Sequence, residues 1–484
     1  MKNTYIFLGI LLFPSVLWSK HSIKFEVSPL GNLIYQLDCI TQAAIFTCSQ
    51  SDYIELWHSE LKPAEADEKM LLRWKNSRKK LNQSIEYDEP DEVQLLTSAN
   101  FPINANKGIN VLDQVRMMAF AANNLDNYKK MMRFWVPINQ LNEELTVLNY
   151  FWPRFQAWFN QQQPELDKFV IDAETLVKEH DVDDLLTAMR TFYQSDLPED
   201  LELPVYLVAH PKQKAGTNGL VYNENSLIEV LKGEQAKSRL AVVIHEIAHF
   251  YHERASIENH LKHMQKFLSK ESQTGKIGYY LFNEAIATAI GNGLFEQRMQ
   301  SAENFKKYQD APLSFYNNQG IDMAAKSALN LVIKQINAKL PIDNSFLTAL
   351  DKIWGQSLHD IKDSPQQRFR HLGLLILDPS FDDMINEVIG IIRPSSGQIT
   401  TLDDSKSIDP TVIEQYPQMD CLIIASNWQQ VTPLHIPGVE SKQKKENGIH
   451  VFDNALGTKY VVIIENDKQT INQHMTDMMM WTSF

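Results

Sequence analysis

The sequence places two histidines and a glutamate within one helical turn in the stretch VVIHEIAHFYHER, residues 242–254. In an α-helix, residues four apart lie on one face, so His245 and His249 would project side by side. Two imidazoles arranged in this way can supply two ligands of a tetrahedral zinc ion. Glu246 would lie beside the metal without ligating it, where a carboxylate can take a proton from zinc-bound water. The pattern therefore predicts a hydrolytic zinc site, and the alternative is an ordinary helix that is rich in histidine.

A catalytic zinc site also needs a third protein ligand and an open fourth position. His252 and Ala255 occupy the positions at which the metzincins carry a glycine and a histidine, so that arrangement is excluded. The segment NEAIATAIGNG (283–293) offers Glu284 on a later helix instead. Its small residues would let this helix approach the histidine helix closely, and they are Ala285, Ala287, Ala289, Gly291 and Gly293. A close-packed helix pair without metal is the alternative interpretation.

HEIAH followed by NEAIATAIG resembles the paired motifs of the gluzincin metallopeptidases, the thermolysin-like group that includes zinc aminopeptidases. The resemblance covers about fifty residues, 240–293. It implies one catalytic zinc ion held by His245, His249 and Glu284, with Glu246 as the general base. It also implies an α+β, zincin-like fold in which an edge strand binds extended substrate, and NSLIEV (225–230) is the strand we expect in that place.

The sequence departs from the thermolysin-like pattern in two ways. The interval of 35 residues between His249 and Glu284 is longer than is typical, which predicts an insertion or a longer helix. Thr288 stands where those enzymes have an aspartate that orients a ligand histidine. Either Thr288 or Glu253 could take over that role.

The remaining histidines and tyrosines give weaker expectations. His252, His260 and His263 lie in a polar stretch and are expected at the surface, although His252 could reach the site. A tyrosine or histidine beyond the glutamate helix should stabilise the oxyanion that forms during hydrolysis. Tyr316 is our choice for this group, and its rivals are Tyr308, His359 and His371.

The elements that must position these residues divide into three regions. Residues 20–140 form a mainly helical N-terminal region, 141–375 the zincin-like domain and 376–484 an α/β appendage. Within the second region, a strand over 203–210 and a hairpin that starts at Gly219 precede helical patterns at 238–270, 279–298 and 320–337.

The N-terminus and the cysteines indicate an exported protein. The apolar run from Tyr5 to Trp18 is too short to span a bilayer comfortably, so residues 1–19 are predicted to be a signal peptide. An uncleaved anchor is the alternative. Cys39 and Cys48 could form a disulfide or remain free buried thiols, and Cys421 is expected to be a thiol in the core.

These observations predict a secreted or periplasmic zinc metallopeptidase that hydrolyses peptide bonds in a peptide or protein. The formal charge of −14 and the lack of a basic block disfavour nucleic acid as a partner, and no stable membrane span is expected after removal of the signal. The absence of a G-x-M-E-N motif favours an endopeptidase. The alternatives are an inactive zincin-like binding or structural protein, and a zinc hydrolase of a non-peptide amide or ester.

Overall fold

The computed structural model describes the chain from residue 21 onwards. It covers 21–484 apart from 43–47, 49, 82–83, 87–107, 123, 199, 214–218, 223–224, 395, 402–418, 440–446 and 456. The predicted signal peptide, residues 1–19, lies outside the described residues. The described chain is a mixed α+β protein dominated by helices.

A four-stranded sheet supports the middle of the molecule, and its strand order is β1-β4-β6-β5. The parallel strands are β1 (Ser22–Val27), β4 (Glu202–His210) and β6 (Asn225–Leu231). The short strand β5 (Gly219–Tyr222) runs antiparallel to β6 and forms one edge of this sheet.

The expectation that 225–230 is an edge strand is therefore wrong. These residues belong to β6, which lies between β4 and β5. The reason is visible in their burial, because Ser226–Val230 are buried without the alternation of a half-exposed strand. β5 pairs with β6 and comes last in the strand order, so β5 forms the edge of the sheet.

Helices from the N-terminal region pack on this sheet and share its core. One continuous core runs from Phe25 to Leu358, so the first strand is part of the same body as the histidine helix. A small ladder joins β2 (Ser84–Glu86) to β3 (Gly108–Asn110). The helices are α1 (Pro29–Thr41), α2 (Gln50–Ser59), α3 (Asp67–Leu81), α5 (Val111–Ala121), α6 (Leu125–Met132), α7 (Ile138–Glu179) and α8 (Val182–Tyr193).

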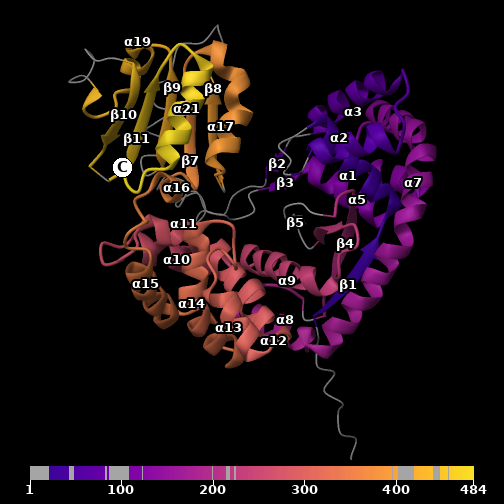
Figure 1. Ribbon diagram of the computed structural model, residues 1–484, viewed down its shortest axis with the longest axis horizontal. Helices are drawn as coiled ribbons and strands as arrows, with labels where there is room; N and C mark the ends of the chain where they lie inside the picture. The colour runs from indigo at the N-terminus through magenta and orange to yellow at the C-terminus, as the bar shows by residue number, and fades with distance from the viewer. Residues whose placement is uncertain are drawn as a thin grey trace, which may run out of the picture.

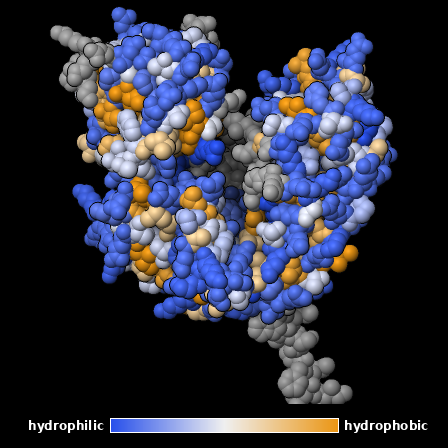
Figure 2. Space-filling model, viewed as in Figure 1, coloured by the Kyte–Doolittle hydropathy of each residue, from blue (hydrophilic) through white to orange (hydrophobic). Residues whose placement is uncertain are grey.

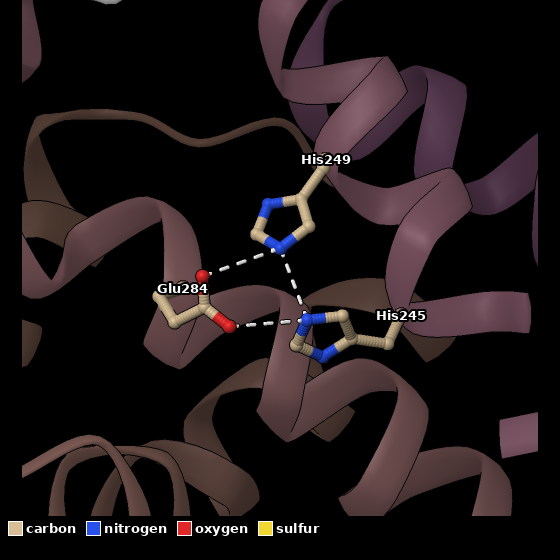
Figure 3. Close-up of side chains that lie close together, drawn as sticks. All are labelled: His245, His249 and Glu284. Atoms are coloured by element: carbon tan, nitrogen blue, oxygen red, sulfur yellow. Dashed lines mark hydrogen bonds and ion pairs between the residues drawn. The ribbon is translucent and has the colours of Figure 1, made fainter. Parts of the chain in front are cut away.

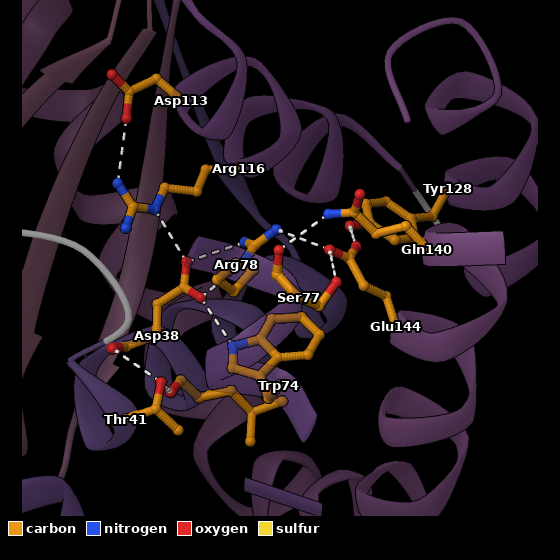
Figure 4. Close-up of polar contacts among 11 residues, drawn as sticks. Asp38, Thr41, Trp74, Ser77, Arg78, Asp113, Arg116, Tyr128, Gln140 and Glu144 are labelled. Carbon is orange, nitrogen blue, oxygen red and sulfur yellow. Dashed lines mark hydrogen bonds and ion pairs between the residues drawn. The ribbon is translucent and has the colours of Figure 1, made fainter. Parts of the chain in front are cut away.

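A buried network of charges joins the N-terminal helices (Figure 4), and a disulfide links α1 to the segment before α2. Cys39 and Cys48 form the disulfide, which decides between the two alternatives for this pair. The fully buried carboxylate of Asp38 accepts hydrogen bonds from Arg78 Nε at 2.8 Å and Arg116 Nε at 2.9 Å. Burial opposes ionisation of Asp38, but the two guanidinium groups hold its pKa below the usual range. Glu144 on α7 lies on the other side of Arg78 and extends the network between helices.

The helices that follow the sheet carry the predicted site. The expected helix over 238–270 is in fact two helices, α9 and α10, separated by a break at residues 254–256. A continuous helical stretch follows, in which a π-helical turn, η1, separates α11 from α12. The bounds are α9 (Ala236–Glu253), α10 (Ile257–Leu268), α11 (Lys276–Thr288), η1 (Ala289–Phe295), α12 (Glu296–Met299), α13 (Ala302–Asp310), α14 (Gln319–Asn337), α15 (Asn344–Ser357) and α16 (Pro365–Arg368).

The C-terminal residues build a second sheet, with the order β10-β11-β9-β7-β8 and its own apolar clusters on both faces. We call this part, residues 369–484, the C-terminal domain. Cys421 is a buried free thiol within it, as expected. Its elements are β7 (His371–Ile376), η2 (Pro379–Met384), α17 (Ile385–Ile392), β8 (Ser396–Thr401), β9 (Asp420–Ala425), α19 (Trp428–Val431), η3 (Thr432–Leu434), β10 (Gly448–Asp453), β11 (Lys459–Ile464) and α21 (Lys468–Met479).

The C-terminal domain and the N-terminal helices form two lobes above the layer that contains α9 and α11 (Figure 1). The molecular surface is hollowed between these lobes (Figure 2). Among the described residues, no helix has the length and apolar character needed to cross a membrane.

The buried network predicts a large effect of the substitution Asp38→Ala. It would leave Arg78 and Arg116 buried without their shared counter-charge, and we expect the free energy of unfolding to fall by about 3–5 kcal/mol. Urea denaturation followed by circular dichroism measures this loss. The control is Glu143→Ala, which removes an exposed ion pair with Arg73 and should change the free energy by about 1 kcal/mol or less. Equal losses in the two variants would contradict the prediction.

Candidate metal centre

Two helices bring His245, His249 and Glu284 together at one point (Figure 3). The Nε2 atoms of the two histidines on α9 are 3.0 Å apart. The carboxylate of Glu284 on α11 lies 3.2 Å from His245 Nε2 and 3.5 Å from His249 Nε2. A tetrahedral ion with bonds of about 2.0–2.1 Å separates its ligands by about 3.3 Å, so these distances suit a single metal ion. This group could therefore hold a metal ion.

Neighbouring side chains orient both imidazole rings. Asn283 Oδ1 lies 3.0 Å from His249 Nδ1 and accepts a hydrogen bond from it, and Thr288 Oγ1 lies 3.5 Å from His245 Nδ1. Thr288 thus occupies the orienting position that the sequence indicated, with a longer contact than the one made by Asn283. Glu253, the other candidate, makes no hydrogen bond to either ring among the described residues. The sequence analysis missed Asn283, although it directly precedes the ligand glutamate.

The arrangement requires positive charge at its centre. A ring that carries a proton on Nε2 donates a hydrogen bond to the carboxylate of Glu284, whereas a neutral ring with its proton on Nδ1 points the lone pair of Nε2 at that carboxylate. Burial opposes ionisation of Glu284, yet the two histidines hold its pKa well below the usual value. Burial likewise disfavours the charged form of His249, but Glu284 raises the pKa of that ring above its ordinary value. The positive charge at this point is therefore supplied either by protons on the histidines or by a bound cation, which would accept a lone pair from each of the three side chains.

The close approach of α9 to the glutamate helix depends on a glycine. A Cβ atom built on Gly291 would lie 2.5 Å from the backbone oxygen of Ala241 and 2.8 Å from Cβ of His245. Real Cβ atoms do not make such contacts, so any larger residue would push the two helices apart. The prediction that small residues allow close packing is thus confirmed at Gly291, which lies in the π-helical turn η1.

Glu246 lies beside the ligands and under the edge strand β5. Burial raises the pKa of its carboxyl group. A Cβ atom on Gly219, the first residue of β5, would lie 2.5 Å from Oε1 of Glu246. The bare backbone of β5 therefore passes directly over the carboxylate that was predicted to be the general base.

Tyr316 reaches the metal centre, and its rivals have other surroundings. Its ring stacks on His245 with centroids 6.1 Å apart, so the phenol lies beside the candidate ligands. Burial and the charge of Glu284 both raise the pKa of this phenol. Tyr308 stacks on Phe315, His359 is exposed, and His371 packs against Tyr280.

The expectation that His252, His260 and His263 are solvated is wrong, because each is at most 4% exposed. The break after α9 folds α10 back, so the three rings pack together between α9, α10 and Phe282. Burial lowers the pKa of His252, of His260 to about 4 and of His263 to about 3. Their ligand atoms do not converge, since the three-residue group identified among the described residues is His245, His249 and Glu284.

Comparison with known proteins adds no relative, since no family model, curated protein or solved structure matches the chain. Interpretation of the site therefore depends on its own residues and geometry.

The packing of Gly291 predicts that Gly291→Ala weakens metal binding at least tenfold, because the new methyl group would separate Glu284 from the two histidines. The dissociation constant for Zn²⁺, measured by competition with a chromophoric chelator, tests this. Gly390→Ala is the matched control, since Gly390 is also helical but a Cβ atom there meets nothing within 4 Å. Equal affinities in the two variants would show that the close approach is not required.

The buried histidines predict that the protein is sensitive to acid. The unfolded chain takes up protons at these residues near pH 6.5, whereas the folded protein does so only near pH 3–4. Their contribution to stability is therefore complete above about pH 6.5 and is lost as the pH falls toward 4. We expect His263→Leu to make the free energy of unfolding less dependent on pH in this window, by up to about 1.4 kcal/mol per pH unit.

Urea denaturation at several pH values measures this slope. The control is His359→Leu, which removes an exposed histidine and should leave the slope of the wild type unchanged. Parallel curves for all three proteins would refute the assignment.

Proposed function

We propose that this protein is a zinc-dependent metallopeptidase with a zincin-like catalytic region, exported from the cell that makes it. The observation that carries the proposal is the convergence of His245, His249 and Glu284, with the carboxylate of Glu246 next to them. Two imidazoles and one carboxylate are a ligand set that suits zinc, and they leave a fourth position open. A purely structural site is usually closed by four protein ligands, and it has no need of a base beside it.

Zinc held by these ligands would supply a Lewis acid that polarises a carbonyl group and lowers the pKa of water. The residues of the chain carry out the remaining work. Glu246 takes a proton from the attacking water and passes it to the leaving amine, and its raised pKa suits both steps. Tyr316, whose ring stacks on His245, would donate a hydrogen bond to the oxyanion.

The edge strand β5 supports a peptide as the substrate. An extended peptide can pair with the free edge of a sheet, which fixes its backbone while its side chains alternate between the two faces. β5 forms this edge and passes over Glu246, so a peptide paired with it would run past the general base.

The decisive variant is Glu246→Gln, which removes the base but keeps the size of the side chain. We expect it to lower the hydrolysis of a peptide library by about 10²–10⁴-fold while one zinc ion per chain is retained. Elemental analysis gives the metal content, and mass spectrometry of the products identifies the cleaved bonds.

Two further variants separate the alternatives. His245→Ala should lose both the metal and hydrolysis. Gly219→Ala should reduce hydrolysis and leave the metal in place, because its methyl group displaces Glu246 alone. A wild-type protein that binds zinc but cleaves nothing in the library, and that Glu246→Gln leaves unchanged, would point to a binding or structural role.

A further inference from the structure

One face of α11 links the metal centre to the C-terminal domain. Lys276, Tyr280 and Glu284 recur every four residues, so they lie along one side of this helix. Glu284 enters the metal centre, whereas Tyr280 packs against His371 of β7 with ring centroids 5.5 Å apart. The side of the helix that presents the ligand is thus also the side on which the C-terminal domain rests.

Asp420, the first residue of β9, makes a second contact between the C-terminal domain and α11. Its carboxylate is fully buried and accepts hydrogen bonds from Lys276 Nζ at 2.8 Å and from the backbone nitrogen of Lys459 at 2.7 Å. Arg368, on the segment that enters the C-terminal domain, pairs with the same carboxylate at 3.0 Å. Breaking a buried ion pair is costly, so this contact resists displacement of the helix.

Lys276 lies where a positive charge is disfavoured, so its ion pair with Asp420 is needed to keep it there. A cation in the first turn of a helix is opposed by the helix dipole, and burial lowers the pKa of this amine further. Asp420 is the counter-charge that offsets both effects. The loop before α11 is fixed independently by Asp351 of α15, which accepts hydrogen bonds from Ser272, Gln273 and Thr274.

We propose that the C-terminal domain is a clamp on the metal centre, in which Asp420 acts through Lys276 as a positioning residue for Glu284. Arg370, which directly precedes β7, is buried and lies close enough to Glu284 and Tyr316 for their charges to act on its guanidinium group. The clamp makes metal affinity depend on the docking of a domain that supplies no ligand. This inference rests on the metal centre of the proposed function but not on peptide hydrolysis.

The test compares Asp420→Asn and Lys276→Met with the wild type in the full-length protein. We expect each variant to weaken Zn²⁺ binding about tenfold by chelator competition, and to change the visible absorption spectrum of the Co²⁺-substituted protein. Lys276→Arg, which keeps the charge, should restore both properties. The matched control is Asp453→Asn, which removes an exposed ion pair with Lys459 in the same domain and should behave as the wild type.

Each outcome bears on a different claim. Wild-type affinity and spectra in both Asp420→Asn and Lys276→Met would overturn the clamp while the metal centre stands. A wild-type protein that takes up neither Zn²⁺ nor Co²⁺ would overturn the metal centre and the clamp together. If Asp420→Asn does not fold, Lys276→Met still decides, because Asp420 keeps its contacts with Arg368 and Lys459 there.

Discussion

The metal centre depends on how closely the helix with Glu284 can approach the helix with His245 and His249. The candidate ligands His249 and Glu284 lie 35 residues apart in the chain, and a tetrahedral ion tolerates errors of only a few tenths of an ångström. Gly291 allows this approach by placing backbone against backbone one turn beyond Thr288. Asp351 and Asp420 hold the start of α11, but they could not bring Glu284 to the histidines if a larger side chain at position 291 kept the two helices apart.

The pairing of the two histidines could be predicted from the sequence because it is local to one helix, whereas Glu284 lies on a later helix. The spacing of His245 and His249 determines that they share a face once a helix forms, and the small residues after Glu284 indicate close packing. The hairpin of β5 and β6 was also predictable, since its two strands are adjacent in the chain. Thr288 was indicated only by the resemblance to thermolysin-like enzymes, which left Glu253 as the alternative, and the structure places Thr288 against His245.

Burial and strand order could not be predicted in the same way, because they depend on elements that are distant in sequence. The stretch with His252, His260 and His263 has a polar composition, and only the sharp turn between α9 and α10 buries it. The position of β6 inside the sheet depends on β4 pairing with its other edge. A hydrophobic pattern shows that a segment is covered, but it does not show which segment covers it.

His245 has only a long contact with Thr288 behind it, which explains why rigid packing around the candidate ligands would matter. A carboxylate behind a ligand histidine makes the ring a stronger base and holds it in place, whereas the hydroxyl of Thr288 is neutral and lies at a longer distance. A less basic ligand leaves more positive charge on a bound ion, which favours polarisation of a carbonyl group but lowers the affinity for the metal. Preorganisation can offset that loss, since ligands that are already in position lose little entropy on binding. Gly291, Asp351 and Asp420 all contribute to such preorganisation, so in this protein metal affinity would come from packing around the ligands rather than from a charge behind them.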